Sequence, residues 1–173
     1  MSHSVLVSFG YFSIIPHLLA FISISTSKML KLNIVSTLLL GFSMMAFEGH
    51  NGFLISFISV ILKFTALLGI CTNIKEWHKT IIGLIFGASY FILFNNEGWF
   101  GILPSISMIF VVFADFQKNI LTMKYYYYGS AFCWLIYGIF LQSNAAILYD
   151  LIGISALTFS LINIKKQTTI GSK

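Results

Sequence analysis

The chain has 173 residues, of which 58% are hydrophobic and only 9% are charged. An ordinary soluble domain carries about a quarter charged residues, so the composition excludes that class and indicates an integral membrane protein. The formal net charge of +5 does not indicate a nucleic-acid partner, because the lysines are scattered between apolar segments and form no basic patch. We therefore expect membrane lipid, and no nucleic acid, as a partner.

Seven apolar segments follow one another, separated by short polar breaks at charged residues, Gly and Asn. Each is long enough, or nearly so, to cross a bilayer as a helix. The first segment has no Lys or Arg before it and is about as long as a span, so we expect a retained helix and not a signal peptide. Residues 1–173 are thus predicted to form a single all-α integral membrane domain. The predicted transmembrane helices cover residues 5–24, 32–48, 53–71, 80–95, 100–115, 124–141 and 145–164.

The positions of the lysines predict the direction of each helix. Nine of the ten lysines follow the first, third, fifth and seventh segments, and none lies in the breaks after the second, fourth and sixth. Since Lys and Arg in short loops are retained in the cytoplasm, we expect an external N-terminus and a cytoplasmic C-terminus, with residues 165–173 as a cytoplasmic tail. The nine are Lys28, Lys31, Lys75, Lys79, Lys118, Lys124, Lys165, Lys166 and Lys173.

Two parts of the chain resemble each other. "FGYFSII" begins at Phe9 and "FGILPSI" begins at Phe100, an offset of 91 residues. After an adjustment of two residues, "NGFLISFISVILK" from Asn51 aligns with "NAAILYDLIGISA" from Asn144. In both parts a helix, a lysine-bearing turn, a helix, a short turn and a helix follow one another.

This similarity predicts two parallel three-helix units, residues 5–71 and residues 100–164, joined by the linker helix 80–95. In transporters built from repeats, the substrate site lies near the membrane midplane, where the units face each other. The alternative interpretation is that any two apolar three-helix segments look alike when few identities are required.

The first predicted helix contains Pro16 followed by His17. Proline removes one hydrogen bond of the helix, so Pro16 weakens the backbone ladder at this point. A histidine in a span can titrate near neutral pH, which would suit proton coupling and makes His17 a candidate pathway residue. The other interpretation is a hydrogen bond from His17 to a neighbouring helix.

Lys63 lies in the apolar stretch "ISVILKFTALLG", about eleven residues into the third predicted helix and hence near the membrane centre. A lysine at that depth costs about 2.5 to 3.5 kcal/mol and usually faces a cavity or a partner. We expect the partner to be Asp150 in the seventh predicted helix, and such a pair between the units would form a gate or bind substrate. The alternatives are a lysine that snorkels along lipid and a purely structural pair.

Two further pairs of residues share one face of a predicted helix. In the linker helix, "GLIFG" places Gly83 and Gly87 at a spacing that lets another backbone approach, either to dock the two units or to form an oligomer contact. Trp134 and Tyr137 lie one helical turn apart and could present an aromatic face to a sugar ring or another flat solute. Core packing is the alternative for the aromatic pair.

The stretch "LTMKYYYYGSAFCWLIYGIF", Leu121 to Phe140, and the order of the other features resemble a known family. From about Gly10 to Lys166, the chain is similar to the YgjV family of bacterial inner membrane proteins, which is grouped with the SWEET and PQ-loop (MtN3-like) transporters. The resemblance implies a three-plus-one-plus-three bundle in the bacterial inner membrane. The SWEET-like relatives move sugars by alternating access and use prolines as hinges. The resemblance therefore implies Pro16 and Pro104, in the first and fifth predicted helices, as hinge candidates, although they are only partial counterparts and the chain contains no Pro-Gln pair.

The sequence thus predicts a small multi-pass transporter or facilitator that has a small-molecule solute as its partner. The rival is a non-transporting helix-bundle protein that stabilises or regulates another membrane component, and a homo-oligomer stays open as well. The chain has no HExxH, no GxSxG and no paired aspartates within a span, so we expect no enzyme activity. Its scattered histidines and two cysteines have no metal-ligand spacing, and we expect neither a metal nor a cofactor.

Overall fold

The computed structural model describes residues 3–44, 50–69, 75–93, 102–140 and 144–171, and within these ranges the protein is all-helical. Seven helices follow one another in the described chain, which confirms the predicted order of helices. They are α1 (His3–Ile22), α2 (Thr26–Met44), α3 (His50–Leu67), α4 (Glu76–Leu93), α5 (Ile102–Asp115), α6 (Ile120–Phe140) and α7 (Asn144–Gly171).

Most of the described helices begin a few residues before their predicted starts, and polar side chains cap two of them. The Asn119 side chain accepts a hydrogen bond from the Leu121 backbone N–H at 2.8 Å, so α6 begins about one turn before the predicted residue 124. At the start of α2, the Ser25 hydroxyl accepts a 3.4 Å hydrogen bond from the Lys28 backbone N–H. Lysines that the sequence pattern assigns to loops therefore lie in the first turns of helices.

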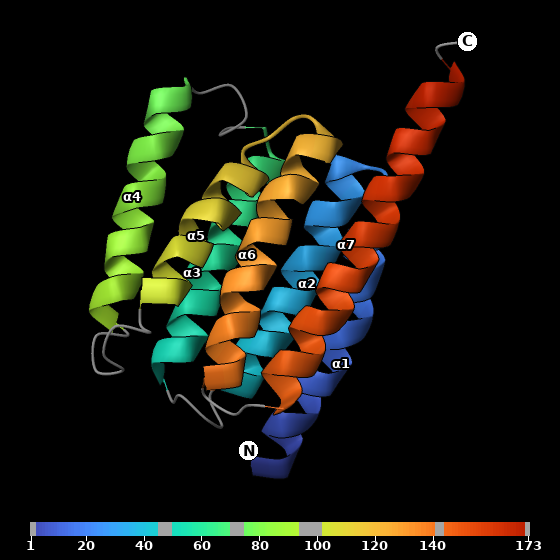
Figure 1. Ribbon diagram of the computed structural model, residues 1–173. Coiled ribbons are helices and arrows are strands. Elements are labelled where there is room, and N and C mark those ends of the chain that lie inside the picture. Colours follow the sequence, from blue (N-terminus) through green and yellow to red (C-terminus); the bar gives the residue numbers. More distant parts are fainter. Residues whose placement is uncertain (1–2, 45–49, 70–74, 94–101, 141–143, 172–173) are drawn as a thin grey trace.

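The last helix is longer than predicted. α7 has 28 residues and continues to Gly171, so most of the predicted tail of residues 165–173 is part of this helix. The helix continues because no Gly or Pro interrupts the sequence between Gly153 and Gly171. Its C-terminal turns extend beyond the ends of the other helices (Figure 1).

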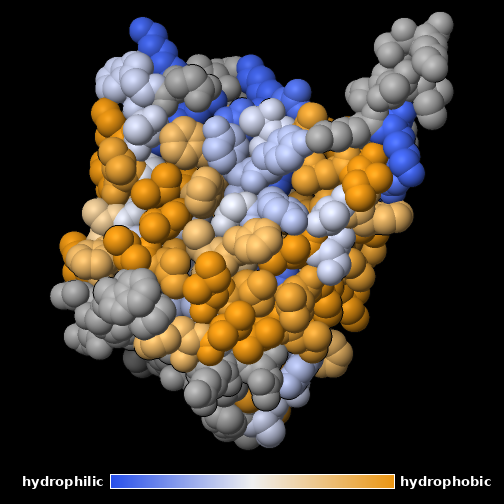
Figure 2. Space-filling model, in the orientation of Figure 1, coloured by the Kyte–Doolittle hydropathy of each residue, from blue (hydrophilic) through white to orange (hydrophobic). Residues whose placement is uncertain are grey.

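The helices alternate in direction. α1, α3, α5 and α7 run one way, and α2, α4 and α6 run the other way (Figure 1). The connections after α1 and α5 and the C-terminal end of α7 consequently lie at one end of the bundle. Lys28, Lys75 and Lys118 lie at or beside helix termini at this end, and Figure 2 shows hydrophilic residues gathered there. We call it the lysine-rich end.

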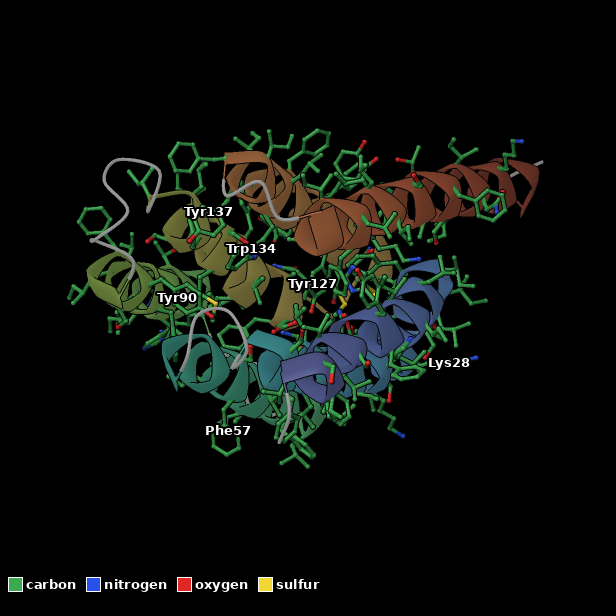
Figure 3. The ribbon with its side chains drawn as sticks, turned by 90° about the horizontal axis from the view of Figure 1, so that it is seen from below. Lys28, Phe57, Tyr90, Tyr127, Trp134 and Tyr137 are labelled. Carbon is green, nitrogen blue, oxygen red and sulfur yellow. The ribbon has the colours of Figure 1, made fainter. Side chains whose placement is uncertain are left out.

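Six helices form a closed ring. α1 packs against α2, α2 against α3, α3 against α5, α5 against α6, α6 against α7, and α7 against α1. α4 lies outside the ring and packs against α5 (Figures 1 and 3). Two halves, α1–α3 and α5–α7, therefore meet at two seams, one between α3 and α5 and the other between α1 and α7.

Charged side chains lie inside this bundle, while many large apolar side chains lie outside. Lys63, Asp115 and Lys124 are 3%, 0% and 0% exposed, whereas Phe159 and Ile92 are 62% and 74% exposed. A soluble protein keeps unpaired charges in water and has little reason to expose so many large apolar side chains. The distribution suits a bundle whose outer face contacts lipid.

By length and mean hydropathy alone, only some of the described helices qualify as membrane spans. Within the described ranges, two helical segments meet the criterion for a membrane span, Ser4–Ile22 and Ala146–Ile164. Ser56–Leu67 and Ile102–Asp115 are apolar but shorter. The all-helical architecture is compatible with an integral membrane protein, while the seven spans and the three-plus-one-plus-three repeat stay predictions.

Two glycines let α4 approach α5 closely. A Cβ atom added to Gly87 would lie 2.8 Å from Ile109 Cγ1 and 3.2 Å from the Ser105 backbone oxygen, which is too close for normal packing. A Cβ atom on Gly83 would lie 3.6 Å from Ile109 Cγ2, an ordinary van der Waals contact. The small-residue face of α4 therefore docks within the chain, on the second half of the bundle.

We predict that Gly87→Ala weakens this contact and that Gly83→Ala does not. Overpacking forces neighbouring atoms to shift, so the free energy of unfolding of Gly87→Ala should fall by about 1 kcal/mol or more. Denaturant unfolding in detergent micelles measures this difference for both variants. Equal stabilities of the two variants would show that the α4–α5 contact is looser than the structure indicates.

Candidate functional site

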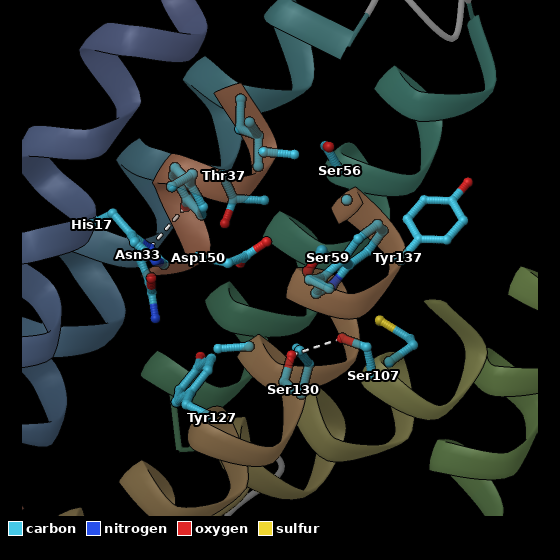
Figure 4. Close-up of a pocket in the computed structure, with 18 of the residues that line it drawn as sticks. His17, Asn33, Thr37, Ser56, Ser59, Ser107, Tyr127, Ser130, Tyr137 and Asp150 are labelled. Carbon is cyan, nitrogen blue, oxygen red and sulfur yellow. Dashed lines mark hydrogen bonds between the residues drawn. The ribbon is translucent and has the colours of Figure 1, made fainter. Parts of the chain in front are cut away.

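A cavity of about 180 Å³ lies inside the ring, between the two halves of the bundle (Figure 4). All seven helices contribute to its wall. The five pathway residues predicted from the sequence all line it, although they come from four different helices. These five are His17, Lys63, Trp134, Tyr137 and Asp150. The other polar side chains of the wall are Asn33, Thr37, Ser56, Ser59, Tyr90, Ser107, Tyr127, Ser130 and Tyr149.

Lys63 forms an ion pair with Asp115, the last residue of α5. The Lys63 Nζ lies 3.7 Å from the Asp115 Oδ2 and donates a 2.8 Å hydrogen bond to the Ser59 Oγ one turn earlier in α3. The Tyr127 hydroxyl, from α6, donates to the other carboxylate oxygen of Asp115. The pair thus crosses the α3–α5 seam and is held by a third helix.

The predicted pairing of Lys63 with Asp150 is replaced by this contact. Asp150 is on α7, whose neighbours are α1 and α6, and the cavity separates α7 from α3. Asp115 was not predicted as a partner, because its position at the end of the fifth predicted helix is typical of a boundary residue. The sequence gives the depth of each charge along its helix but not the order of the helices around the ring.

Lys124 is a second buried lysine, which the sequence analysis missed. It is fully buried, and its Nζ donates a 3.0 Å hydrogen bond to the Phe21 backbone carbonyl and another to the Ser160 hydroxyl. Phe21 lies in the last turn of α1, where backbone carbonyls have no partner within the helix and carry the negative end of its dipole. The Lys124 ammonium therefore caps α1 and ties it to α6 and α7.

His17 lies in a hydrogen-bonded chain that joins three helices. Its Nδ1 is 2.8 Å from the Tyr149 hydroxyl of α7, which is in turn 2.8 Å from the Ser36 hydroxyl of α2. The His17 ring also stacks on the Tyr149 ring, with centroids 3.8 Å apart. Gly153 makes room for this ring, because a Cβ atom there would lie 2.7 Å from the His17 Nε2. The geometry agrees with the structural interpretation, a hydrogen bond between helices.

The two prolines occupy different positions in their helices. Pro16 lies in the interior of α1, where its missing N–H removes one hydrogen bond of the helix. Pro104 is the third described residue of α5, and residues 94–101 before this helix lie outside the described ranges. Pro16 and Pro104 both stay candidate hinges.

Trp134 and Tyr137 form an aromatic pair on the cavity wall. Their ring centroids lie 5.6 Å apart at an interplanar angle of 76°, an edge-to-face arrangement. Tyr137 is 2% exposed. Only the rings' cavity-facing parts are open to a solute, so the pair serves both packing and lining, the two interpretations that the sequence left as alternatives.

Asp150 differs from the other charged groups inside the bundle. It is 6% exposed and lines the cavity, yet among the described residues its carboxylate has neither a hydrogen-bond donor nor a basic side chain as a partner. The neighbouring Tyr149 directs its hydroxyl toward His17 and Ser36 instead. Burying a charged group without a partner is costly, which makes Asp150 the position on the wall that most requires a ligand.

We predict that the Lys63–Asp115 pair is coupled in a double-mutant cycle. Lys63→Met leaves Asp115 buried without a cation, which costs about 3 to 5 kcal/mol of unfolding free energy. Adding Asp115→Asn removes the orphaned charge, so the double variant should be more stable than Lys63→Met alone. Denaturant unfolding in detergent measures the free energy of unfolding of each of the four proteins in the cycle. Additive effects would contradict the observed pairing.

Lys124 provides a second stability test. Lys124→Met preserves the length of the side chain but removes the hydrogen bonds to Phe21 and Ser160, and hydrogen bonds from charged groups contribute about 1.5 to 3 kcal/mol. Lys28→Met is the matched control, because Lys28 is exposed and points away from the bundle (Figure 3). The first variant should unfold at lower denaturant concentration and the control should not. An unchanged midpoint for Lys124→Met would argue against the cap.

Comparison with known proteins assigns the chain to a family. Neither the comparison with the curated proteins nor that with the solved structures gave a match. A family model described as "Bacterial inner membrane protein", Imp-YgjV, matches residues 5–168, nearly the whole chain. This match confirms the resemblance to the YgjV family that the sequence shows, and it agrees with a helical bundle whose outer face is apolar. The chain therefore belongs to the Imp-YgjV family of bacterial inner membrane proteins.

Proposed function

We propose that the protein is a transporter or facilitator of a small solute, which passes through the central cavity by alternating access between α1–α3 and α5–α7. The observation that carries this proposal is the position of the cavity, which lies between the two halves and is lined by polar side chains from both. A membrane bundle that served only as a structural element could fill its interior with apolar side chains. Polar and ionisable groups inside a span usually mark a solute pathway.

The contacts at the two seams support an alternating mechanism. Lys63 joins Asp115 across the α3–α5 seam, and Lys124 joins the Phe21 carbonyl, so one contact links α3 to α5 and the other links α6 to α1. Asp115 is the last residue of α5, and Phe21 is the next-to-last residue of α1, so both contacts lie toward the lysine-rich end. Breaking them would let the halves separate there.

The cavity extends toward the end of the bundle opposite the lysine-rich end. Its wall includes Leu40 near the end of α2, Gly138 near the end of α6 and Ala146 at the start of α7. All three positions lie toward the end of the bundle opposite the lysine-rich end (Figure 1). We take this conformation as the one closed at the lysine-rich end, which the positive-inside rule assigns to the cytoplasm.

The size of the cavity limits the solute. A volume of about 180 Å³ corresponds to roughly six water molecules and is smaller than the roughly 300 to 1,000 Å³ of pockets for drug-sized ligands. A small solute is therefore expected. The resemblance to SWEET-like transporters would make it sugar-like, and no catalytic step belongs to the proposed mechanism.

The rival function is a non-transporting bundle protein that stabilises or regulates another membrane component, and the Gly83 and Gly87 face of α4 was one surface through which it could act. α5 covers that face within the chain, so no specific observation favours the rival over transport.

Filling the cavity tests the proposed function. We predict that Thr37→Phe, which places a ring in the cavity, reduces solute uptake to the level of protein-free liposomes. Thr158→Phe is the matched control, because Thr158 is exposed on α7 and does not line the cavity. Stopped-flow light scattering of proteoliposomes exposed to glucose, glycerol or choline chloride measures the uptake. If the unmodified protein transports none of these faster than empty liposomes, or if both variants behave alike, a pathway through this cavity is excluded for them.

A further inference from the structure

We infer that the cavity binds a small organic monocation whose charged nitrogen contacts the Asp150 carboxylate. The inference rests on the proposed function only in taking the cavity as a solute site, and it adds the charge and the chemical class of the solute. It differs from the sugar class that the resemblance implies.

The Asp150 carboxylate is the first reason. It is 94% buried, since 6% of it is exposed, and it points into the cavity toward the space between Thr37 and Ser59 (Figure 4). Among the described residues it has no hydrogen-bond donor and no basic side chain as a partner. A buried carboxylate in this position is stabilised when a cation binds against it.

When Asp150 is ionised, the charges around the cavity leave a net negative charge at this site. The charged side chains on the wall are Lys63 and Asp150, and Lys63 is neutralised by Asp115. Lys124 bonds to Ser160, ten residues beyond Asp150 in α7 and hence about 15 Å away along the helix axis. The His17 Nδ1 is hydrogen-bonded to the Tyr149 hydroxyl. A solute with one positive charge is therefore complementary to the site.

An aromatic ring lies at the level of Asp150. A Cβ atom on Gly138 of α6 would lie 3.3 Å from the Ala146 Cβ of α7, which fixes the register of these two antiparallel helices. Because the helices run in opposite directions, the residue one turn before Gly138, Trp134, lies at the same level as the residue one turn after Ala146, Asp150. Indole faces attract alkylammonium groups, most strongly where water is excluded.

The same surroundings do not suit a metal ion. Within the described ranges, no three His, Cys, Asp or Glu side chains lie close enough together to hold one. One carboxylate beside an indole ring instead matches the way proteins bind amines and quaternary ammonium ions. These surroundings therefore favour an organic monocation over a metal ion held by several protein ligands.

A third helix of the wall, α2, offers a hydrogen bond to the rest of the solute. Asn33 of α2 is 3% exposed and lines the cavity, and its side-chain nitrogen has no hydrogen-bond partner in the described structure. A buried donor of this kind requires an acceptor. A hydroxyl group on the solute would supply it, so amino alcohols and their quaternary derivatives fit the site best.

Choline is the probe that tests this inference. Isothermal titration of the purified full-length protein in detergent should show binding of choline and weaker binding of its uncharged isostere, in which carbon replaces the quaternary nitrogen. Asp150→Asn should raise the Kd for choline about tenfold or more, because the charged contact is lost. Ser155→Ala, an exposed position on the same helix, should leave the Kd unchanged.

The other outcomes distinguish a failure of this inference from a failure of the proposed function. If glucose or the uncharged isostere binds as tightly as choline, or if Asp150→Asn binds choline normally, the solute class is wrong while the proposed pathway stands. If sodium or potassium binds and choline does not, the site takes an inorganic cation. If choline binds through Asp150 but proteoliposomes take up no solute, the site exists and the transport function fails. Should Asp150→Asn not fold, Trp134→Leu is the second variant, and undiminished choline binding by it would also overturn the inference.

Discussion

The Lys63–Asp115 ion pair determines how the two halves of this bundle meet. A charge inside an apolar-surfaced bundle is costly without a partner, and the partner of Lys63 is at the end of α5. α3 must therefore lie beside α5, and the ring of six helices closes in the order that leaves α7 on the far side of the cavity. The wall of the cavity follows from that order, including Asp150, which has no partner among the residues that the structure describes.

Buried lysines tie both halves together toward the same end. Lys63 belongs to the first half and reaches the second, whereas Lys124 belongs to the second half and reaches the last turn of α1. Packing of apolar side chains is non-directional, but these contacts have defined geometry and can exist only when the helix termini are adjacent. They give the bundle a conformation that is specific at the lysine-rich end and depends mainly on packing elsewhere.

The sequence predicted the number and order of the helices, because long apolar segments between polar breaks carry that information directly. It also identified Lys63 and Asp150 as residues of one cavity, since an ionisable residue within an apolar segment is conspicuous. Their pairing could not be predicted, because helical periodicity does not specify which helices are neighbours. Lys124 was placed at the very start of its helix, and its burial was missed, for a related reason: the Asn119 cap that places it inside α6 is a single side-chain hydrogen bond in a polar stretch.

The overhang of α7 has a consequence for how the halves can move. At 28 residues the helix is about 42 Å long, about 12 Å more than the hydrocarbon core of a bilayer. Its last turns, with the exposed Lys166, would therefore lie among the lipid headgroups, where each basic residue gains about 1 kcal/mol from anionic lipid. Such an anchor resists displacement of α7 along the membrane normal. Tilting would then be the easier motion for the second half, and the content of anionic lipid in the membrane would influence the rate of opening.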